Sequence, residues 1–252
     1  MEQVGVQLGL AVRAQERFQS RSHAADQLTA SVVPRALPDV PGFEAAALYH
    51  PGASVGAEFY DVFPLADGWG FALGGSAGQG EEAASVSAMV RGGLRVLSVW
   101  EREPDQVVRK VNEALVAQGG GLFVMAVAGF VSGRRIRMSS AGHHPAAMVS
   151  PDGSVRFAAG GGVPLGISAE AETATQEMTL EPGQMLVFYS EGLISSRDAH
   201  GAPYGEERLA DVLARYAGQS PATVAKAVEE DRHAFSAGQV WDEIVILALR
   251  AL

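Results

Sequence analysis

The sequence predicts one α+β domain with layered sheets, preceded by an N-terminal helix. Three observations support this fold class. Short strand-like runs are separated by Pro-Gly and Asp-Gly turns, two helical stretches lie in the middle of the chain, and late helices are followed by a final apolar strand. Runs of strands and then runs of helices are typical of α+β architectures in which sheets and helices stack as layers.

The first segment, residues 1–33, contains no Pro and is expected to be a helix. Its apolar residues recur at spacings of three, four and seven: Val4, Leu8, Ala11, Phe18, Ala25, Leu28 and Val32. We expect this helix either to mediate homodimerisation or partner docking, or to pack on its own domain. Three prolines, Pro34, Pro38 and Pro41, end it and separate it from a second unit, residues 34–252.

The second unit alternates between period-two and helical patterns. Strands are expected at 43–50, 58–65, 69–73, 122–131, 134–140, 146–149, 172–180, 185–189 and 244–249. Helices are expected at 82–99, 104–118, 206–216 and 221–235. We expect the first strands to form antiparallel hairpins, because turn residues separate them.

Composition and charge exclude several classes of function. The 252 residues carry 29 Asp+Glu against 19 Lys+Arg, a net charge of −10, which argues against a general nucleic-acid binder. The absence of Cys excludes disulfides, thiolate zinc sites and thiol nucleophiles. No signal-peptide pattern and no apolar run of about 20 residues is present, so a cytoplasmic protein without a membrane partner is expected.

Two local patterns give weak signals for chemistry. The glycine-rich run 74–80 lies between a predicted strand and a predicted helix, as phosphate-binding loops do, but it lacks the Gly-Lys-Ser/Thr ending of a P-loop. A tight strand-to-helix turn is the favoured explanation. His143 and His144 are adjacent and would point to opposite faces of a strand, which argues against chelation of one ion.

Carboxylates at the ends of predicted strands give a stronger signal. Glu58 lies beside Gly56, Glu191 precedes Gly192, and Asp242 with Glu243 directly precedes the last strand. If these groups converge, they suit a hard cation such as Mg²⁺ or Mn²⁺. Each of them taken alone is more typically a solvated acid, because Asp and Glu are mostly exposed.

A series of short motifs runs in order through the chain after the N-terminal helix. They are VPRALP (33–38), PG (41–42), VGAEFYD (55–61), GGSAGQG (74–80), NEAL (112–115), FVMA (123–126), AGHHP (141–145), PLG (164–166), PGQ (182–184), YSEGL (189–193), YGEERL (204–209) and DEI (242–244). Together they resemble the metal-dependent Ser/Thr protein phosphatases of type 2C (the PPM family), specifically the bacterial SpoIIE/RsbU branch.

The resemblance implies an α-β-β-α sandwich, in which helices flank two antiparallel sheets. It also implies that Asp residues at one end bind two Mg²⁺ or Mn²⁺ ions, and that a bridging water attacks phosphoserine or phosphothreonine. In this branch the substrate is typically a phosphorylated anti-sigma-factor antagonist, so the expected partner is a regulatory protein of a partner-switching pathway.

The chain departs from the family at the metal ligands that the resemblance implies. Glu58 and Glu191 stand where the family has Asp, and Gly75 stands where the family has the Asp that bridges both metals. Only Asp242 keeps the expected ligand type. Gly75 has no side chain and cannot bridge two ions, so this ligand position is lost.

The candidate site has three further members. The backbone carbonyl of Ser76 is a candidate contact to an ion, and Asp61 and His143 are candidates for positions behind the ligands. We do not assign a catalytic residue from the sequence.

Two main hypotheses follow from these departures. In the first, the chain is a pseudophosphatase with weak or no catalysis and no cofactor, which keeps the fold to bind a regulator of a sigma-factor pathway. In the second, Glu58, Glu191 and Asp242 hold Mg²⁺ or Mn²⁺ in a rearranged site and the chain is an active phosphatase. The loss of a shared ligand favours the first. A third hypothesis is that the chain is a small-molecule phosphatase or a nucleotide-binding protein that uses the same cleft.

Overall fold

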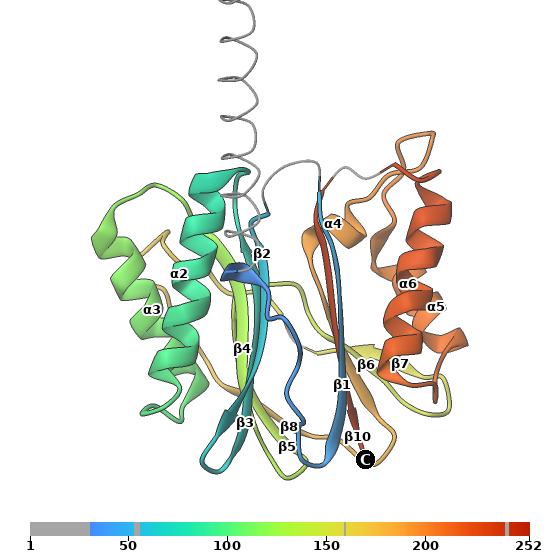
Figure 1. Ribbon diagram of the computed structural model, residues 1–252, viewed down its shortest axis with the longest axis horizontal. Helices are drawn as coiled ribbons and strands as arrows, with labels where there is room; N and C mark the ends of the chain where they lie inside the picture. The colour runs from blue at the N-terminus through green and yellow to red at the C-terminus, as the bar shows by residue number, and fades with distance from the viewer. Residues whose placement is uncertain (1–30, 53–55, 159, 240–241) are drawn as a thin grey trace, which may run out of the picture.

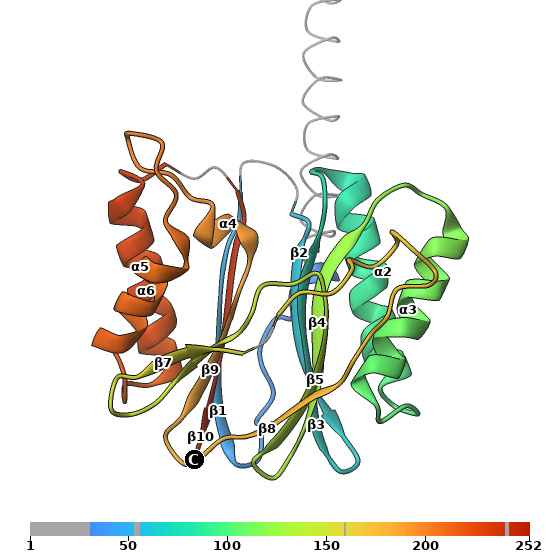
Figure 2. The same cartoon turned by 180° about the vertical axis from the view of Figure 1, so that it is seen from behind.

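The computed structural model describes residues 31–52, 56–158, 160–239 and 242–252. Two antiparallel five-stranded sheets face each other, and helices cover the outer face of each sheet (Figures 1 and 2). The strand orders are β1-β10-β9-β6-β7 in the first sheet and β2-β3-β4-β5-β8 in the second sheet. The predicted four-layer α+β sandwich is therefore confirmed.

The element bounds follow the sequence patterns closely. The strands are β1 (Phe43–His50), β2 (Glu58–Leu65), β3 (Gly68–Ser76), β4 (Val124–Ser132), β5 (Arg135–Ala141), β6 (Ala147–Val149), β7 (Val155–Phe157), β8 (Gln176–Thr179), β9 (Met185–Tyr189) and β10 (Ile244–Ala251). The helices are α2 (Glu81–Leu97), α3 (Pro104–Gln118), α4 (Glu191–Ile194), α5 (Gly205–Arg215) and α6 (Pro221–Phe235).

Local sequence signals explain where the longer helices begin and end. Helices α3 and α6 each start with Pro in the first turn, where the missing N–H has no intrahelical partner to lose. Ser220 caps α6 by accepting a hydrogen bond from the Thr223 backbone at 3.2 Å. Gly119, with φ +71°, ends α3 in the left-handed conformation that glycine adopts without strain.

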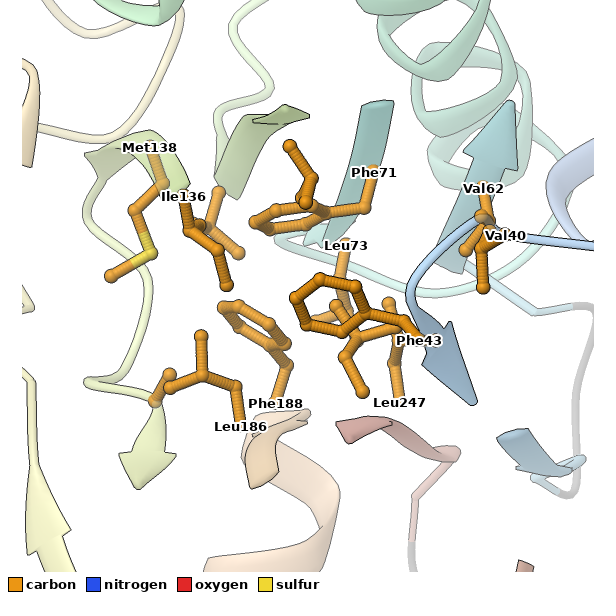
Figure 3. Close-up of a cluster of buried hydrophobic side chains, with 14 of the residues drawn as sticks. Val40, Phe43, Val62, Phe71, Leu73, Ile136, Met138, Leu186, Phe188 and Leu247 are labelled. Carbon is orange, nitrogen blue, oxygen red and sulfur yellow. The ribbon is translucent and has the colours of Figure 1, made fainter. Parts of the chain in front are cut away.

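Three apolar layers hold the sandwich together. Between the sheets, side chains from both inner faces interdigitate, among them Phe71 and Leu73 from β3 and Phe188 from β9 (Figure 3). The rings of Phe71 and Phe188 lie 5.0 Å apart between centroids. A second layer joins the first sheet to α5 and α6, and a third joins the second sheet to α2 and α3. Burial of these faces is the main stabilising term of such a fold.

The structure differs from the sequence predictions in a few places. The predicted N-terminal helix lies almost wholly outside the described residues. Strands β1 and β2 do not form a hairpin: β1 pairs with β10, and the connection through Pro51 and Gly52 crosses from one sheet to the other. The short elements β7 and α4 were not expected. Pro64 lies in β2, an edge strand, where its missing N–H costs no ladder hydrogen bond.

No helix among the described residues is long and apolar enough to cross a membrane.

Candidate functional site

Four segments that are far apart in the sequence meet at one end of the sandwich, the end at which α4 lies in Figure 1. They are the start of β2, the end of β3 with the glycine-rich loop after it, the start of α4, and the residues just before β10. A Cβ built on Gly192 would lie 3.2 Å from the Cβ of Asp242, so the start of α4 and the segment before β10 are in direct contact. We refer to this end as the cleft end.

Glu58 and Gly75 lie directly opposite each other in the β2–β3 ladder. Directly opposed residues in an antiparallel ladder present their side chains on the same face. A Cβ built on Gly75 would lie 2.5 Å from Cδ and 2.6 Å from Oε2 of Glu58. The Glu58 carboxyl therefore lies over Gly75, in the volume that a side chain at position 75 would need.

The environment of Glu58 disfavours its charged form. Burial, and then the nearby carboxylates of Glu243, Asp242 and Glu191, raise the pKa of Glu58 to about 8. These acids come from three different segments, and the structure brings Glu58, Glu191 and Asp242 near one another at one end of the sheets.

Glu243 holds the start of β2 in place. Its Oε2 accepts hydrogen bonds from the backbone N–H groups of Ala57 at 2.7 Å and Glu58 at 2.8 Å, and its Oε1 accepts one from the Tyr49 hydroxyl at 2.9 Å. A Cβ on Gly56 would lie 2.7 Å from Cδ of Glu243, so glycine leaves room for this carboxyl. Glu243 is buried, and burial raises its pKa.

Glu191 is engaged by a histidine of another segment. Nε2 of His144 lies 2.5 Å from Oε2 of Glu191, and the His144 ring stacks on Tyr189 with 6.0 Å between centroids. Asp242 is exposed, and its Oδ1 accepts a hydrogen bond from the Glu243 backbone at 2.8 Å. Both carboxylates already have partners within the chain.

His143 is buried, with 4% of its surface exposed. Burial lowers the pKa of His143 to about 4, so the ring is neutral, and its Nδ1–H donates to the backbone oxygen of His144 at 3.0 Å. The histidine that contacts a candidate ligand is therefore His144, whereas His143 supports the backbone behind it. The sequence predicts His143, but not His144, as a site residue.

Asp61 does not face the cleft end. It lies three residues after Glu58 on β2, so its side chain leaves the opposite face of the strand, toward α2. There it is fully buried and forms ion pairs with Arg95 at 3.0 Å and Arg91 at 3.3 Å. The placement of Asp61 behind the metal ligands is corrected by this geometry.

Ser76 ends β3 and joins it to α2. Its backbone N–H donates to Oγ of Ser87 at 3.1 Å, and the Ser87 hydroxyl donates in turn to the backbone oxygen of Ala57. Ser87 is a fully buried polar residue on the otherwise apolar face of α2. A serine at a core position of an amphipathic helix is a sequence signal for such a buried hydrogen bond. Neither this role of Ser87 nor the structural role of Glu243 was predicted.

The residues at the cleft end do not fit a two-metal centre. No group of three or more His, Asp or Glu side chains among the described residues is arranged to hold a metal ion. Gly75 offers no side chain, and the Glu58 carboxyl fills its place. Glu191 and Asp242 are bound to His144 and to the Glu243 backbone.

Comparison with known proteins identifies the fold and the family. The family model of stage II sporulation protein E (SpoIIE) matches residues 66–252. A curated relative, protein IcfG of Synechocystis sp., is 23% identical over 218 residues, which cover 74% of this chain and 34% of that protein. The chain thus spans about a third of the length of this curated relative.

Solved structures share the same sandwich. The SiaA-PP2C domain of Pseudomonas aeruginosa superposes with a TM-score of 0.80 at 21% identity, over 95% of this chain and 99% of that chain. The RsbU and RsbW domains of a Mycobacterium tuberculosis protein give a TM-score of 0.74 at 23% identity, over 88% of this chain and 63% of that chain. The catalytic domain of the phosphatase PstP, solved with two manganese ions, gives 0.62 at 17% identity, over 83% of this chain and 98% of that chain.

The match of the family model to most of the chain agrees with the two facing sheets and with the motif residues gathered at the cleft end. The chain belongs to the SpoIIE family of PP2C-type phosphatase domains.

Proposed function

We propose that this chain is a regulator in a bacterial partner-switching pathway of the kind that controls sigma factors, with weak or no phosphatase activity. It binds a regulatory protein, such as a phosphorylated anti-sigma-factor antagonist, at the cleft end of the sandwich. Membership of the SpoIIE family and the likeness to SiaA and RsbU domains support the pathway. The net charge of −10 argues against nucleic acid as the partner.

The observation that carries the proposal is the lack of a side chain at position 75. Gly75 is the residue before the last one of β3 and lies at the centre of the candidate site. By resemblance, this position would supply the carboxylate shared by two divalent ions. Without it, at most three carboxylates, those of Glu58, Glu191 and Asp242, supply a charge of −3 against the +4 of two ions, and the ligand that would hold both ions together is missing.

A second candidate function is an active phosphatase with a rearranged site. The observation in its favour is that the Glu58 carboxyl reaches over Gly75, so one carboxylate does stand near the vacated position. In that case Mg²⁺ or Mn²⁺ would neutralise the phosphate and supply a hydroxide nucleophile. Both functions are expected in the cytoplasm.

Two measurements separate these functions. The first is calorimetric titration of the purified chain with Mn²⁺, together with hydrolysis of a generic aryl phosphate with and without Mn²⁺. We expect no saturable binding below millimolar concentration and no metal-dependent turnover. A metal-dependent rate that disappears in Asp242→Asn would contradict the proposal and support the active phosphatase.

The second measurement is binding to the anti-sigma-factor antagonists of the source organism, each prepared with and without phosphoserine. We expect one antagonist to bind, and we expect binding to persist in the presence of a metal chelator. If no antagonist binds, either with or without phosphoserine, the partner-switching role is contradicted.

A further inference from the structure

Gly75 differs from the other glycines of β3 in what surrounds it. A Cβ on Gly74 would lie 2.9 Å from the Ala126 backbone, and a Cβ on Gly70 would meet the Phe63 ring, so those glycines allow close packing within the sheet. For Gly75 the three nearest atoms all belong to the carboxyl group of Glu58. Gly75 is also absent from the positions with positive φ. Position 75 therefore lacks room for a larger residue, because the Glu58 side chain fills the space that a side chain there would need.

The overlap is too close for a side chain at 75 to coexist with Glu58 as it stands. Non-bonded carbon atoms attract each other best at about 3.5–4.0 Å, whereas a Cβ at 75 would lie 2.5 Å from Cδ of Glu58. The obstructing group is the end of a flexible side chain, so the strands themselves need not move. A residue larger than glycine at position 75 has to displace the Glu58 carboxyl.

We propose that Glu58 and Gly75 form one coupled unit: the carboxylate at this point of the cleft is supplied from β2, across the ladder, in place of a side chain from β3. This inference rests on the proposed function. It attributes the loss of the two-metal site to positions 58 and 75 together, rather than to position 75 alone. A single change at position 75 then cannot rebuild a metal site, since a carboxylate introduced there would share its volume with Glu58.

The proposal also specifies the change that rebuilds the site. Shortening Glu58 to Asp withdraws its carboxylate by about one C–C bond, roughly 1.5 Å. That leaves room for a second carboxylate at position 75, and the two would stand side by side on the same face of the ladder.

A double-mutant cycle tests the coupling without any metal. Melting temperatures are measured for the full chain and for Glu58→Ala, Gly75→Ala and the double variant. We expect Gly75→Ala to be tolerated at least about 2 °C better when residue 58 is Ala than when it is Glu. Gly92→Ala is the matched control, because a Cβ there meets nothing within 4 Å among the described residues, and its effect should add to that of Glu58→Ala. An additive cycle for 58 and 75 would overturn the coupled unit.

Manganese binding tests the rebuilt site. Calorimetric titration with Mn²⁺ is compared for Gly75→Asp, Glu58→Asp, the double variant Glu58→Asp/Gly75→Asp, and Glu58→Asp/Gly75→Asn as the neutral control of equal size. We expect the double Asp variant to bind Mn²⁺ at least tenfold more tightly than Gly75→Asp, and the Asn control to show no gain. Binding by Gly75→Asp as tight as that of the double variant, or no gain in the double variant, would overturn the inference.

The two proposals fail in different ways. Metal-dependent hydrolysis by the unaltered chain would end the proposed function and leave the coupling in the cycle intact. An additive double-mutant cycle would contradict the coupling between Glu58 and Gly75. It would not contradict the proposed lack of turnover, which would then need another explanation.

Discussion

Oε2 of Glu243 accepts a hydrogen bond from the backbone N–H of Glu58 at 2.8 Å, across 185 positions of sequence. The same carboxylate also accepts from the Ala57 backbone and the Tyr49 hydroxyl. One buried acid therefore joins the end of β1, the start of β2 and the start of β10. Because these strands belong to different sheets, Glu243 fixes how the two sheets meet at the cleft end.

Replacement of Glu243 by Ala should destabilise the fold strongly. It leaves two backbone N–H groups and the Tyr49 hydroxyl without their acceptor, at about 1–3 kcal/mol for each buried group that stays unpaired. We expect a loss of about 3 kcal/mol in the free energy of unfolding, measured by urea denaturation. Asp242→Ala is the control, because Asp242 is exposed and, within the part of the chain that the structure describes, accepts only the Glu243 N–H; its cost should stay below about 1 kcal/mol.

Replacement of Asp61 by Asn should also lower the free energy of unfolding. Asp61 lies on the face of β2 opposite to that of Glu58. The change leaves the Arg91 and Arg95 guanidinium groups without a buried counter-charge, and breaking a buried pair costs about 3–5 kcal/mol. Arg95→Ala should cost less, because Arg95 is half-exposed and Asp61 keeps Arg91. If Asp61→Asn is as stable as the parent by urea denaturation, the buried ion-pair network is not what holds α2 on the sheet.

The contribution of His143 to the stability of the chain should be lost below about pH 6.5. Burial lowers the pKa of His143 from 6.5 to about 4, so between these values the unfolded chain binds a proton at this residue that the folded chain does not. This contribution is fully present above pH 6.5 and decreases as the pH falls toward 4, by about 3 kcal/mol in total. Glu58, whose pKa is raised to about 8, contributes a slope of opposite sign over much of this range, so the His143 contribution is obtained by comparing variants in urea denaturation between pH 7.5 and 4.5.

Two variants isolate that contribution. As the pH falls from 6.5 toward 4, the parent should lose stability relative to His143→Gln, because Gln does not titrate. His200→Gln is the control, because His200 lies exposed in a turn. A difference in stability between the parent and His143→Gln that is independent of pH would contradict the prediction.

Removal of residues 1–30 tests the predicted N-terminal helix. We expect light scattering to give a dimer mass for the full chain and a monomer mass for the truncated one. The truncated chain should keep its fold, because the three apolar layers are built from residues 32–251. An unchanged molar mass after truncation would exclude the helix as the dimer interface and favour its packing on the domain.

Much of the fold could be predicted because its strands and helices carry strong local patterns. Strand 185–189 and helices 104–118 and 221–235 were predicted with the bounds that the structure shows. The three-residue strand β7 and the four-residue helix α4 are too short to show a period. The pairing of β1 with β10 is a contact between the two ends of the domain, and turn residues near β1 carry no information about it.

The candidate site was predictable in its membership more than in its geometry. The motifs identified Glu58, Glu191 and Asp242, and strand parity alone could have shown that Asp61 faces away from Glu58. The contact between His144 and Glu191 joins residues 47 positions apart and depends on how the loop before β6 folds. No local pattern predicts such a contact.

The turn between β2 and β3 has a consequence for residues at the far end of the same hairpin. Leu65 pairs with Gly68 around a two-residue loop, Ala66–Asp67, and this first pair sets the register of every other pair in the ladder. Seven steps on, roughly 23 Å away at about 3.3 Å per residue, Glu58 meets Gly75. Lengthening the loop by one residue would slide one strand past the other and turn a whole row of side chains over. The length of the loop therefore helps to determine the geometry of the cleft end, although no atom of the loop lies there.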